Sequence, residues 1–238
     1  YKRRTELIHE AKYSAHYDVE PSSYETLYGL PREVEFCNKC VISNQRPNST
    51  VEFQHTVESE KETISFDAEN VCAACRLADK KRLEIDWVER EAQLKELCDQ
   101  YRKNGSEYDC LVPGSGGKDS FYAAHLLKYK YGMNPLTVTW APHLYTDWGW
   151  RNFQAWINAG FDNYLVTPNA RIHRLITRLA VENLFHPFQP FMLGQKALAP
   201  KMAAMFDIPL VFYGENEAEY GNAIKDTESA ERNWSYFT

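Results

Sequence analysis

Apolar and polar positions follow two different periods along the second half of this 238-residue chain. Short apolar runs predict buried strands at 108–112, 136–140, 163–166 and 208–213. Between them, apolar residues recur at helical spacing, which predicts helices at 118–131, 149–159, 169–184 and 191–206. Strands that alternate with helices form right-handed βαβ units. We therefore expect an α/β fold, a mostly parallel sheet with helices on both faces.

The first part of the chain lacks this alternation. Residues 1–35 are polar and aromatic with little period, and we expect an N-terminal arm there. Residues 36–84 contain paired cysteines and form a second part, while 85–238 carry the alternating pattern after a helix predicted at 86–103. No obvious closing element ends the chain, so we expect residues to be missing at one or both ends.

Composition narrows the class of protein. A length of 238 residues allows one large or two small domains. Hydrophobic residues make up 44% and aromatic residues 14% of the chain, which is ample material for a core. A net charge of −6 and a pI near 5.7 argue against a broad nucleic-acid-binding face, which needs clustered Lys and Arg. No apolar run is long enough to span a bilayer and no signal peptide is visible, so we expect a cytoplasmic protein.

A glycine-rich turn between a predicted strand and a predicted helix is the most informative segment. It reads Val-Pro-Gly-Ser-Gly-Gly-Lys-Asp-Ser from Val112 to Ser120. Successive backbone N–H groups at a helix N-terminus bind phosphate. The spacing differs from a Walker A loop and resembles the pyrophosphate loop (PP-loop) of ATP pyrophosphatases, which cleave ATP to AMP and pyrophosphate. A flexible turn is the alternative. The candidate ATP-binding residues are Pro113, Gly114, Ser115, Gly116, Gly117, Lys118, Asp119 and Ser120.

Four of the six cysteines form two C-x-x-C pairs, the usual ligand set of a structural zinc ion. The predicted zinc ligands are Cys37, Cys40, Cys72 and Cys75. Four thiolates leave no open coordination position for chemistry, and a reducing compartment disfavours disulfides. Phe53 and Phe66 are expected beside the metal. Cys98 and Cys110 lie in a helical and a strand pattern, and we expect them to be buried apolar side chains.

An acidic string follows the last predicted strand, where ligands of parallel sheets bind. It contains Gly214, Asn216 and Glu217. The glycine allows close backbone approach, and carboxylates beside phosphates are suited to Mg²⁺. A solvated acidic turn is the alternative.

Two further segments supply candidate ligands of the nucleotide. Gly194, Gln195 and Lys196 open a predicted helix, so their N–H groups and the lysine charge are expected to hold an anion. Thr139 and Trp140 lie at the end of the second predicted strand, and from this position we expect backbone groups near them to read adenine.

Three arginines form a basic stripe on the helix predicted at 169–184. They are Arg171, Arg174 and Arg178, at positions i, i+3 and i+7. A solvated helix face explains the stripe, and a grip on phosphate or a substrate carboxylate is the alternative.

With these pieces together, the chain resembles the N-acetyl sugar amidotransferase family of the PP-loop ATP pyrophosphatase superfamily. The likeness is carried by the segments 36–41, 71–75, 113–120, 158–169, 186–191 and 194–196, within about residues 36–221. It implies an adenine nucleotide alpha hydrolase-like fold preceded by a small four-cysteine zinc module. It also implies ATP, Mg²⁺ and structural zinc as cofactors. The family acts in bacterial surface-polysaccharide and nonulosonic-acid biosynthesis, including lipopolysaccharide O-antigen.

The implied reaction converts the N-acetyl group of an activated sugar into an acetamidino group. ATP adenylates the amide oxygen, and ammonia then displaces AMP. The catalytic candidates are Lys118, Asp119, Asn216 and Glu217, with Lys118 stabilising phosphate charge. The resemblance implies partner proteins, a glutaminase and a synthase-like subunit that supply ammonia. Two alternatives stay open: a tRNA thiolation enzyme with the same loop, and a non-catalytic zinc-bearing partner subunit.

Overall fold

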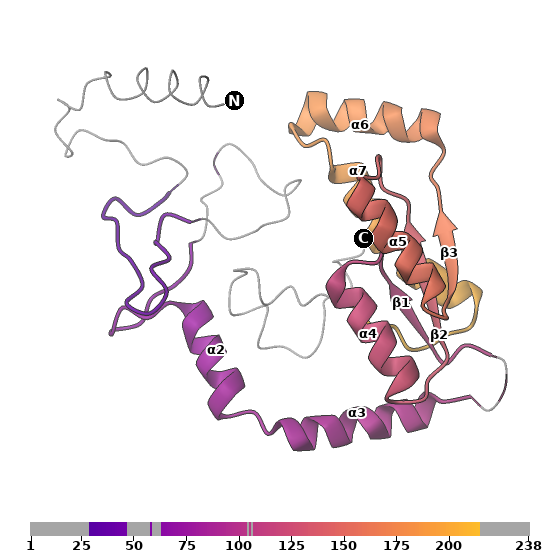
Figure 1. Cartoon of the computed structure of the whole chain (residues 1–238). Helices are drawn as coiled ribbons and strands as arrows, with labels where there is room; N and C mark the ends of the chain where they lie inside the picture. The colour runs from indigo at the N-terminus through magenta and orange to yellow at the C-terminus, as the bar shows by residue number, and fades with distance from the viewer. Residues whose placement is uncertain (1–28, 47–57, 59–62, 104, 106, 215–238) are drawn as a thin grey trace.

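The computed structural model describes residues 29–46, 58, 63–103, 105 and 107–214 (Figure 1). In this part a three-stranded parallel sheet has the strand order β1-β2-β3, with β1 at Cys110–Pro113, β2 at Pro135–Trp140 and β3 at Asp162–Val166. The helices are α2 (Ala73–Leu83), α3 (Trp87–Tyr101), α4 (Lys118–Tyr129), α5 (Asp147–Asn158), α6 (Ala170–Leu184) and α7 (Gln189–Met205). The predicted α/β fold is confirmed.

Side chains of β1 divide between two cores because successive strand residues point to opposite faces. Cys110 and Val112 of β1 pack with residues of α4 and α5, including the fully buried Trp156. Leu111 and Leu136 face the other way, against the buried side of α7. The sheet therefore has helices on both faces, as the alternating pattern predicts.

The segment predicted as a fourth strand at 208–213 pairs with β1 at a single position, so this prediction is only partly right. The Leu111 N–H donates to the Leu210 carbonyl, and the Phe212 N–H donates to the Leu111 carbonyl, both at 2.9 Å. The next donor in a parallel ladder would be the N–H of residue 113. Pro113 has none, so the ladder stops there.

Two helices connect the cysteine pairs to the sheet. Helix α3 matches the helix predicted at 86–103; the Asp86 carboxylate caps its N-terminus, and the buried Cys98 packs into the core beside β1. Helix α2 was not predicted, because Lys80, Lys81 and Arg82 obscure its short apolar pattern. In these described ranges no helix is long and apolar enough to cross a membrane. Residues 1–28 of the predicted arm lie outside the described residues.

Candidate functional site

The glycine-rich loop is anchored to the sheet at its first residue. The Gly114 N–H donates to the Val138 carbonyl at 2.9 Å, and the Gly114 carbonyl accepts from Thr139 Oγ1 at 2.6 Å. Thr139 is itself buried and accepts a hydrogen bond from Asn163 Nδ2 at 3.1 Å. Three neighbouring strands therefore fix the point at which the loop leaves β1. The Thr139 side chain is occupied in this way, which leaves only its backbone for the predicted contact with adenine.

Gly116 turns the loop in a conformation that only glycine adopts readily. Its φ is +87°, and a Cβ added there would lie 2.3 Å from the Asn152 carbonyl oxygen in α5. Gly117 then enters the N-cap position of α4 with φ −63° and ψ 151°. The loop therefore runs directly over the backbone of α5 before the helix begins.

The loop exposes a set of backbone donors at the N-terminus of α4. No side chain caps this helix. Among the described residues, the N–H groups of Ser115, Gly116 and Gly117 donate to no protein acceptor. Clustered N–H groups on the positive end of a helix dipole form an anion-binding concavity. The predicted residues 113–120 thus lie together in a geometry that suits phosphate.

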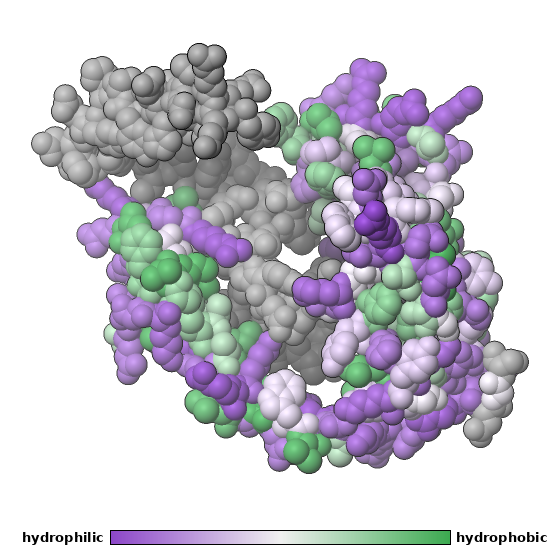
Figure 2. All heavy atoms as spheres, viewed as in Figure 1, coloured by the Kyte–Doolittle hydropathy of each residue, from purple (hydrophilic) through white to green (hydrophobic). Residues whose placement is uncertain are grey.

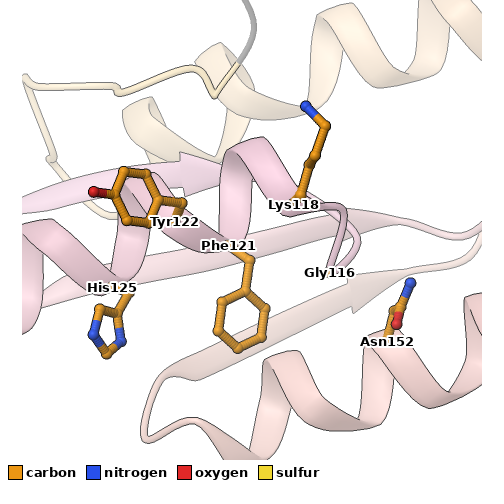
Figure 3. Close-up of a pocket in the computed structure, with 6 residues that line it drawn as sticks. All are labelled: Gly116, Lys118, Phe121, Tyr122, His125 and Asn152. Atoms are coloured by element: carbon orange, nitrogen blue, oxygen red, sulfur yellow. The ribbon is translucent and has the colours of Figure 1, made fainter.

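Charged side chains follow at the first turn of α4. Lys118 is 84% exposed, and its Nζ lies 2.6 Å from Asp119 Oδ1. Figure 3 shows Lys118 extending away from Phe121 and Asn152. The Ser120 hydroxyl donates to the Gly117 carbonyl at 3.3 Å, which closes the turn. The exposed ammonium group of Lys118 beside these N–H groups adds positive charge that favours an anion there.

Gly214 also lies at this helix start. A Cβ added to Gly214 would meet the Ser120 backbone N at 2.4 Å, so the end of the 210–214 segment contacts the first turn of α4. The structure therefore brings Gly214 next to the loop, although about a hundred residues separate them in sequence. Asn216 and Glu217 lie outside the described residues.

The predicted anion site at residues 194–196 does not stand at a helix start. Helix α7 begins at Gln189, with Pro190 in its first turn, so Gly194, Gln195 and Lys196 belong to its interior. Interior N–H groups bond to carbonyls one turn earlier and are not offered to a ligand. Gly194 has a packing role instead: a Cβ there would lie 2.4 Å from two carbons of the partly buried Trp140 indole.

An open surface cavity of about 560 Å³ lies beside the loop. Its lining residues are Gly116, Lys118, Phe121, Tyr122, His125 and Asn152. Figure 3 shows Phe121 between α4 and α5, with Tyr122 and His125 farther along α4. Residues 121, 122 and 125 were not among the predicted site residues. Their spacing from Lys118, i+3, i+4 and i+7, was the signal that placed them on one helix face.

The two cysteine pairs meet in space as predicted. The four candidate ligand atoms all lie within 4.8 Å of one another. The Sγ atoms of Cys37 and Cys75 are 3.9 Å apart, and those of Cys40 and Cys72 are 3.6 Å apart. Sulfurs bound tetrahedrally to zinc at about 2.3 Å are separated by about 3.8 Å. The cluster therefore has the dimensions of a closed four-thiolate zinc site.

Backbone N–H groups favour the thiolate form at one of the four cysteines, Cys37. Burial acts most strongly and raises the pKa of Cys37, but hydrogen bonds from the N–H groups of Cys72, Lys39 and Cys40 outweigh it and lower this pKa to about 6. At Cys75 burial and the neighbouring sulfurs raise the pKa instead. A divalent cation bound to all four sulfurs stabilises their thiolate forms and offsets part of their negative charge. Phe66 packs beside the cluster as predicted, and Phe53 lies outside the described residues.

Comparisons with known proteins give partial likenesses. No protein-family model matches the chain. An 84-residue segment, 35% of the chain, is 33% identical to an uncharacterised protein of Methanocaldococcus jannaschii and covers 29% of that protein. Among solved structures, the chain is similar to the NH3-dependent NAD synthetase from Campylobacter jejuni in complex with the nitrate ion, with a TM-score of 0.45 and 16% identity. That likeness covers 58% of this chain and 62% of the synthetase chain. The chain thus spans less than a third of the first protein and less than two thirds of the second.

Proposed function

We propose that this chain is an ATP-dependent amidotransferase that splits ATP into AMP and pyrophosphate. The observation that carries the proposal is the set of N–H groups of residues 115–117, offered at the start of α4 beside Lys118. Phosphate oxygens are the natural acceptors for such donors. The sequence of this loop, Ser-Gly-Gly-Lys-Asp-Ser, resembles that of ATP pyrophosphatases. This resemblance supports ATP as the bound nucleotide.

The reaction needs the chain to align two substrates and neutralise charge. The oxygen of a carboxamide forms a bond to the α-phosphorus of ATP, and the bond to the β-phosphate breaks to release pyrophosphate. Ammonia then attacks the carbon, a proton leaves the nitrogen, and AMP departs with the original oxygen. In this scheme residues 115–117 hold the pyrophosphate group, and Lys118 offsets the charge that grows on it. Asp119 orients Lys118 through their 2.6 Å ion pair.

Magnesium and zinc ions have different roles in this proposal. Mg²⁺, held by Asp119 together with Glu217, would neutralise phosphate oxygens when bound. Zinc at the cysteine cluster would act only on stability, since four sulfurs complete its coordination. The small core around the cluster contains Ile64, Val71 and Ala73, which is little apolar surface to hold a fold without metal.

The state of the cysteines favours amidation over tRNA thiolation. A thiolation enzyme of this class needs reactive sulfur near the nucleotide. In the described part of the sheet domain the cysteines are Cys98 and Cys110, and both are fully buried. Burial raises the pKa of the Cys110 thiol to about 12, so this thiol is not a nucleophile at neutral pH.

The substrate in this proposal is an activated N-acetyl sugar, and the product is its acetamidino derivative, used in lipopolysaccharide O-antigen or a related glycan. The sequence resemblance supports this choice. The cavity beside Gly116 is suited to such a ligand, because Tyr122 offers an aromatic face and Asn152 offers amide hydrogen bonds. Ammonia would come from a glutaminase partner acting with a synthase-like subunit in the cytoplasm.

One experiment tests the proposal. The chain is incubated with ATP, Mg²⁺, ammonium and a panel of activated N-acetyl sugars, and mass spectrometry looks for replacement of oxygen by NH. Pyrophosphate release is measured in parallel. We expect Lys118→Ala to abolish both signals, while Lys95→Ala, at an exposed lysine of α3, leaves them unchanged. Modification of tRNA without any effect on sugars would overturn the amidotransferase assignment.

A further inference from the structure

Two buried threonines of β2 lie on the face of the sheet that α4 and α5 cover. Val138 packs on the α7 side, so its neighbours Thr137 and Thr139 point to the opposite face. Both threonines are fully buried. Figure 2 shows hydrophilic residues on the outer surface of this domain, where water can bond to them. A hydroxyl removed from bulk water costs free energy unless new hydrogen bonds replace those it loses.

The donors and acceptors around the two threonines follow from the chemistry of their partners. Thr139 Oγ1 lies 2.6 Å from the Gly114 carbonyl oxygen. Thr137 Oγ1 lies 2.8 Å from the Asp162 carbonyl oxygen. A carbonyl only accepts and a hydroxyl has one proton, so each threonine donates that proton to its carbonyl. Each hydroxyl oxygen therefore accepts from its other neighbour, the Asn163 amide, at 2.9 Å for Thr137 and 3.1 Å for Thr139.

Asn163 thus donates both of its amide protons to these two hydroxyls. Its Nδ2 group has two protons, and the two threonine oxygens are the two acceptors. The register agrees with this pairing, because Asn163 of β3 lies directly opposite Thr137 of β2 and the two side chains share a face of the sheet. A chain of hydrogen bonds therefore runs from β3 across β2 to Gly114, the first residue of the loop.

We propose that Asn163 and Thr139 are positioning residues that set which way the peptide between Gly114 and Ser115 faces. This peptide is trans, so its carbonyl and its N–H point in opposite directions. Thr139 holds the Gly114 carbonyl, and the Ser115 N–H consequently points away from Thr139 and joins the donors of residues 116–117. The inference rests on the proposed function, since it concerns the N–H groups that hold the pyrophosphate group.

Without the threonine hydroxyl, this peptide loses the hydrogen bond that fixes its orientation. Glycine at position 114 offers little steric resistance to rotation of the peptide. A rotated peptide would present the Gly114 carbonyl oxygen to phosphate in place of the Ser115 N–H, and the two negative groups would repel each other. The loss of one hydrogen bond to a charged acceptor weakens binding about ten- to hundredfold.

Binding of inorganic pyrophosphate in the presence of Mg²⁺ tests the proposal, measured by isothermal titration calorimetry on the full chain. Thr139→Val should raise the dissociation constant about ten- to hundredfold. Thr139→Ser keeps the hydroxyl and should bind almost as tightly as the wild type. The matched control is Thr137→Val, which removes an equally buried hydroxyl with the same Asn163 donor but no bond to the loop. Its affinity should stay close to that of the wild type.

A second variant and a second measurement address the orientation of the peptide itself. Asn163→Asp keeps the volume of the side chain, but a carboxylate supplies no proton and draws the Thr139 hydroxyl proton away from the Gly114 carbonyl. This variant should therefore also weaken pyrophosphate binding. In NMR spectra, pyrophosphate should move the Ser115 amide proton downfield in the wild type and in Thr137→Val, but much less in Thr139→Val.

The outcomes separate this inference from the function on which it rests. A wild-type chain that binds no pyrophosphate would overturn the proposed function, and this inference with it. Tight wild-type binding with equal loss of affinity in Thr137→Val and Thr139→Val would overturn the inference alone, because the hydroxyls would then act only on stability. A Ser115 amide shift that persists in full in Thr139→Val would do the same.

Discussion

Replacement of Gly116 by alanine tests the geometry of the loop most sharply. The residue has φ +87°, a region that costs an alanine about 1–2 kcal/mol. The new methyl group would also stand 2.3 Å from the Asn152 carbonyl oxygen and 3.0 Å from the Phe153 nitrogen. Both atoms belong to the α5 backbone, which is held by the buried Phe153 and Trp156 side chains, so the loop or the helix must shift.

The two effects add to a measurable loss of stability. Overpacking of this kind costs roughly 1–3 kcal/mol, which with the backbone term gives about 2–5 kcal/mol. At about 2–4 °C per kcal/mol for a protein of this size, Tm should fall by about 4–20 °C. Differential scanning calorimetry and urea unfolding measure the loss.

The neighbouring glycine is a matched control. Gly117 has φ −63°, and a Cβ added there meets nothing within 4 Å. At this N-cap position Gly117→Ala should cost about 0.5–1 kcal/mol. Equal Tm changes in the two variants would refute the reasoning, because they would show that the loop does not run over α5 as described.

Three further predictions concern the surroundings of the site. Thr139→Val keeps the shape of the side chain but removes the hydroxyl that hydrogen-bonds to both Gly114 and Asn163. The free energy of unfolding, measured with urea, should fall by about 1–3 kcal/mol, and an unchanged unfolding midpoint would contradict this. In a helix, alanine is more favourable than glycine by about 1 kcal/mol. Gly194→Ala should nevertheless lower Tm, because the added methyl group would lie 2.4 Å from the Trp140 indole. A higher Tm would show that α7 does not contact this ring. Chelation of zinc should speed hydrogen exchange of the backbone amides around Cys72, while the amides of residues 110–140 stay protected. Equal exchange around Cys72 with and without chelator would contradict a structural metal.

Local patterns carried the prediction of the fold. The alternation of strands and helices and the glycine loop depend on neighbours in sequence. They appear in the structure close to their predicted positions, except that the strand predicted at 208–213 pairs with β1 at a single position. The meeting of the two cysteine pairs could be predicted because a tetrahedral zinc ion takes four thiolates, and each C-x-x-C string supplies two. These features needed no knowledge of how distant elements pack.

The features that the sequence did not predict depend on contacts between elements that are distant in the chain. The start of α7 at Gln189 was signalled by Pro190, a residue favoured in a first helical turn, yet the apolar pattern suggested a later start. The packing role of Gly194 in α7 depends on its contact with Trp140 of β2, and this contact cannot be predicted from the sequence around either residue. The cavity beside Gly116 likewise exists only because α5 crosses the loop.

The central claim is that the loop at the start of α4 directs ATP toward transfer of AMP to a carboxamide oxygen. Its most direct test is ³¹P NMR of a turnover mixture that contains ATP, Mg²⁺, ammonium and an N-acetyl sugar labelled with ¹⁸O in the acetyl group. The account predicts AMP and pyrophosphate in equal amounts, with the ¹⁸O in the phosphate of AMP. Formation of ADP and phosphate, or AMP without the label, would contradict it.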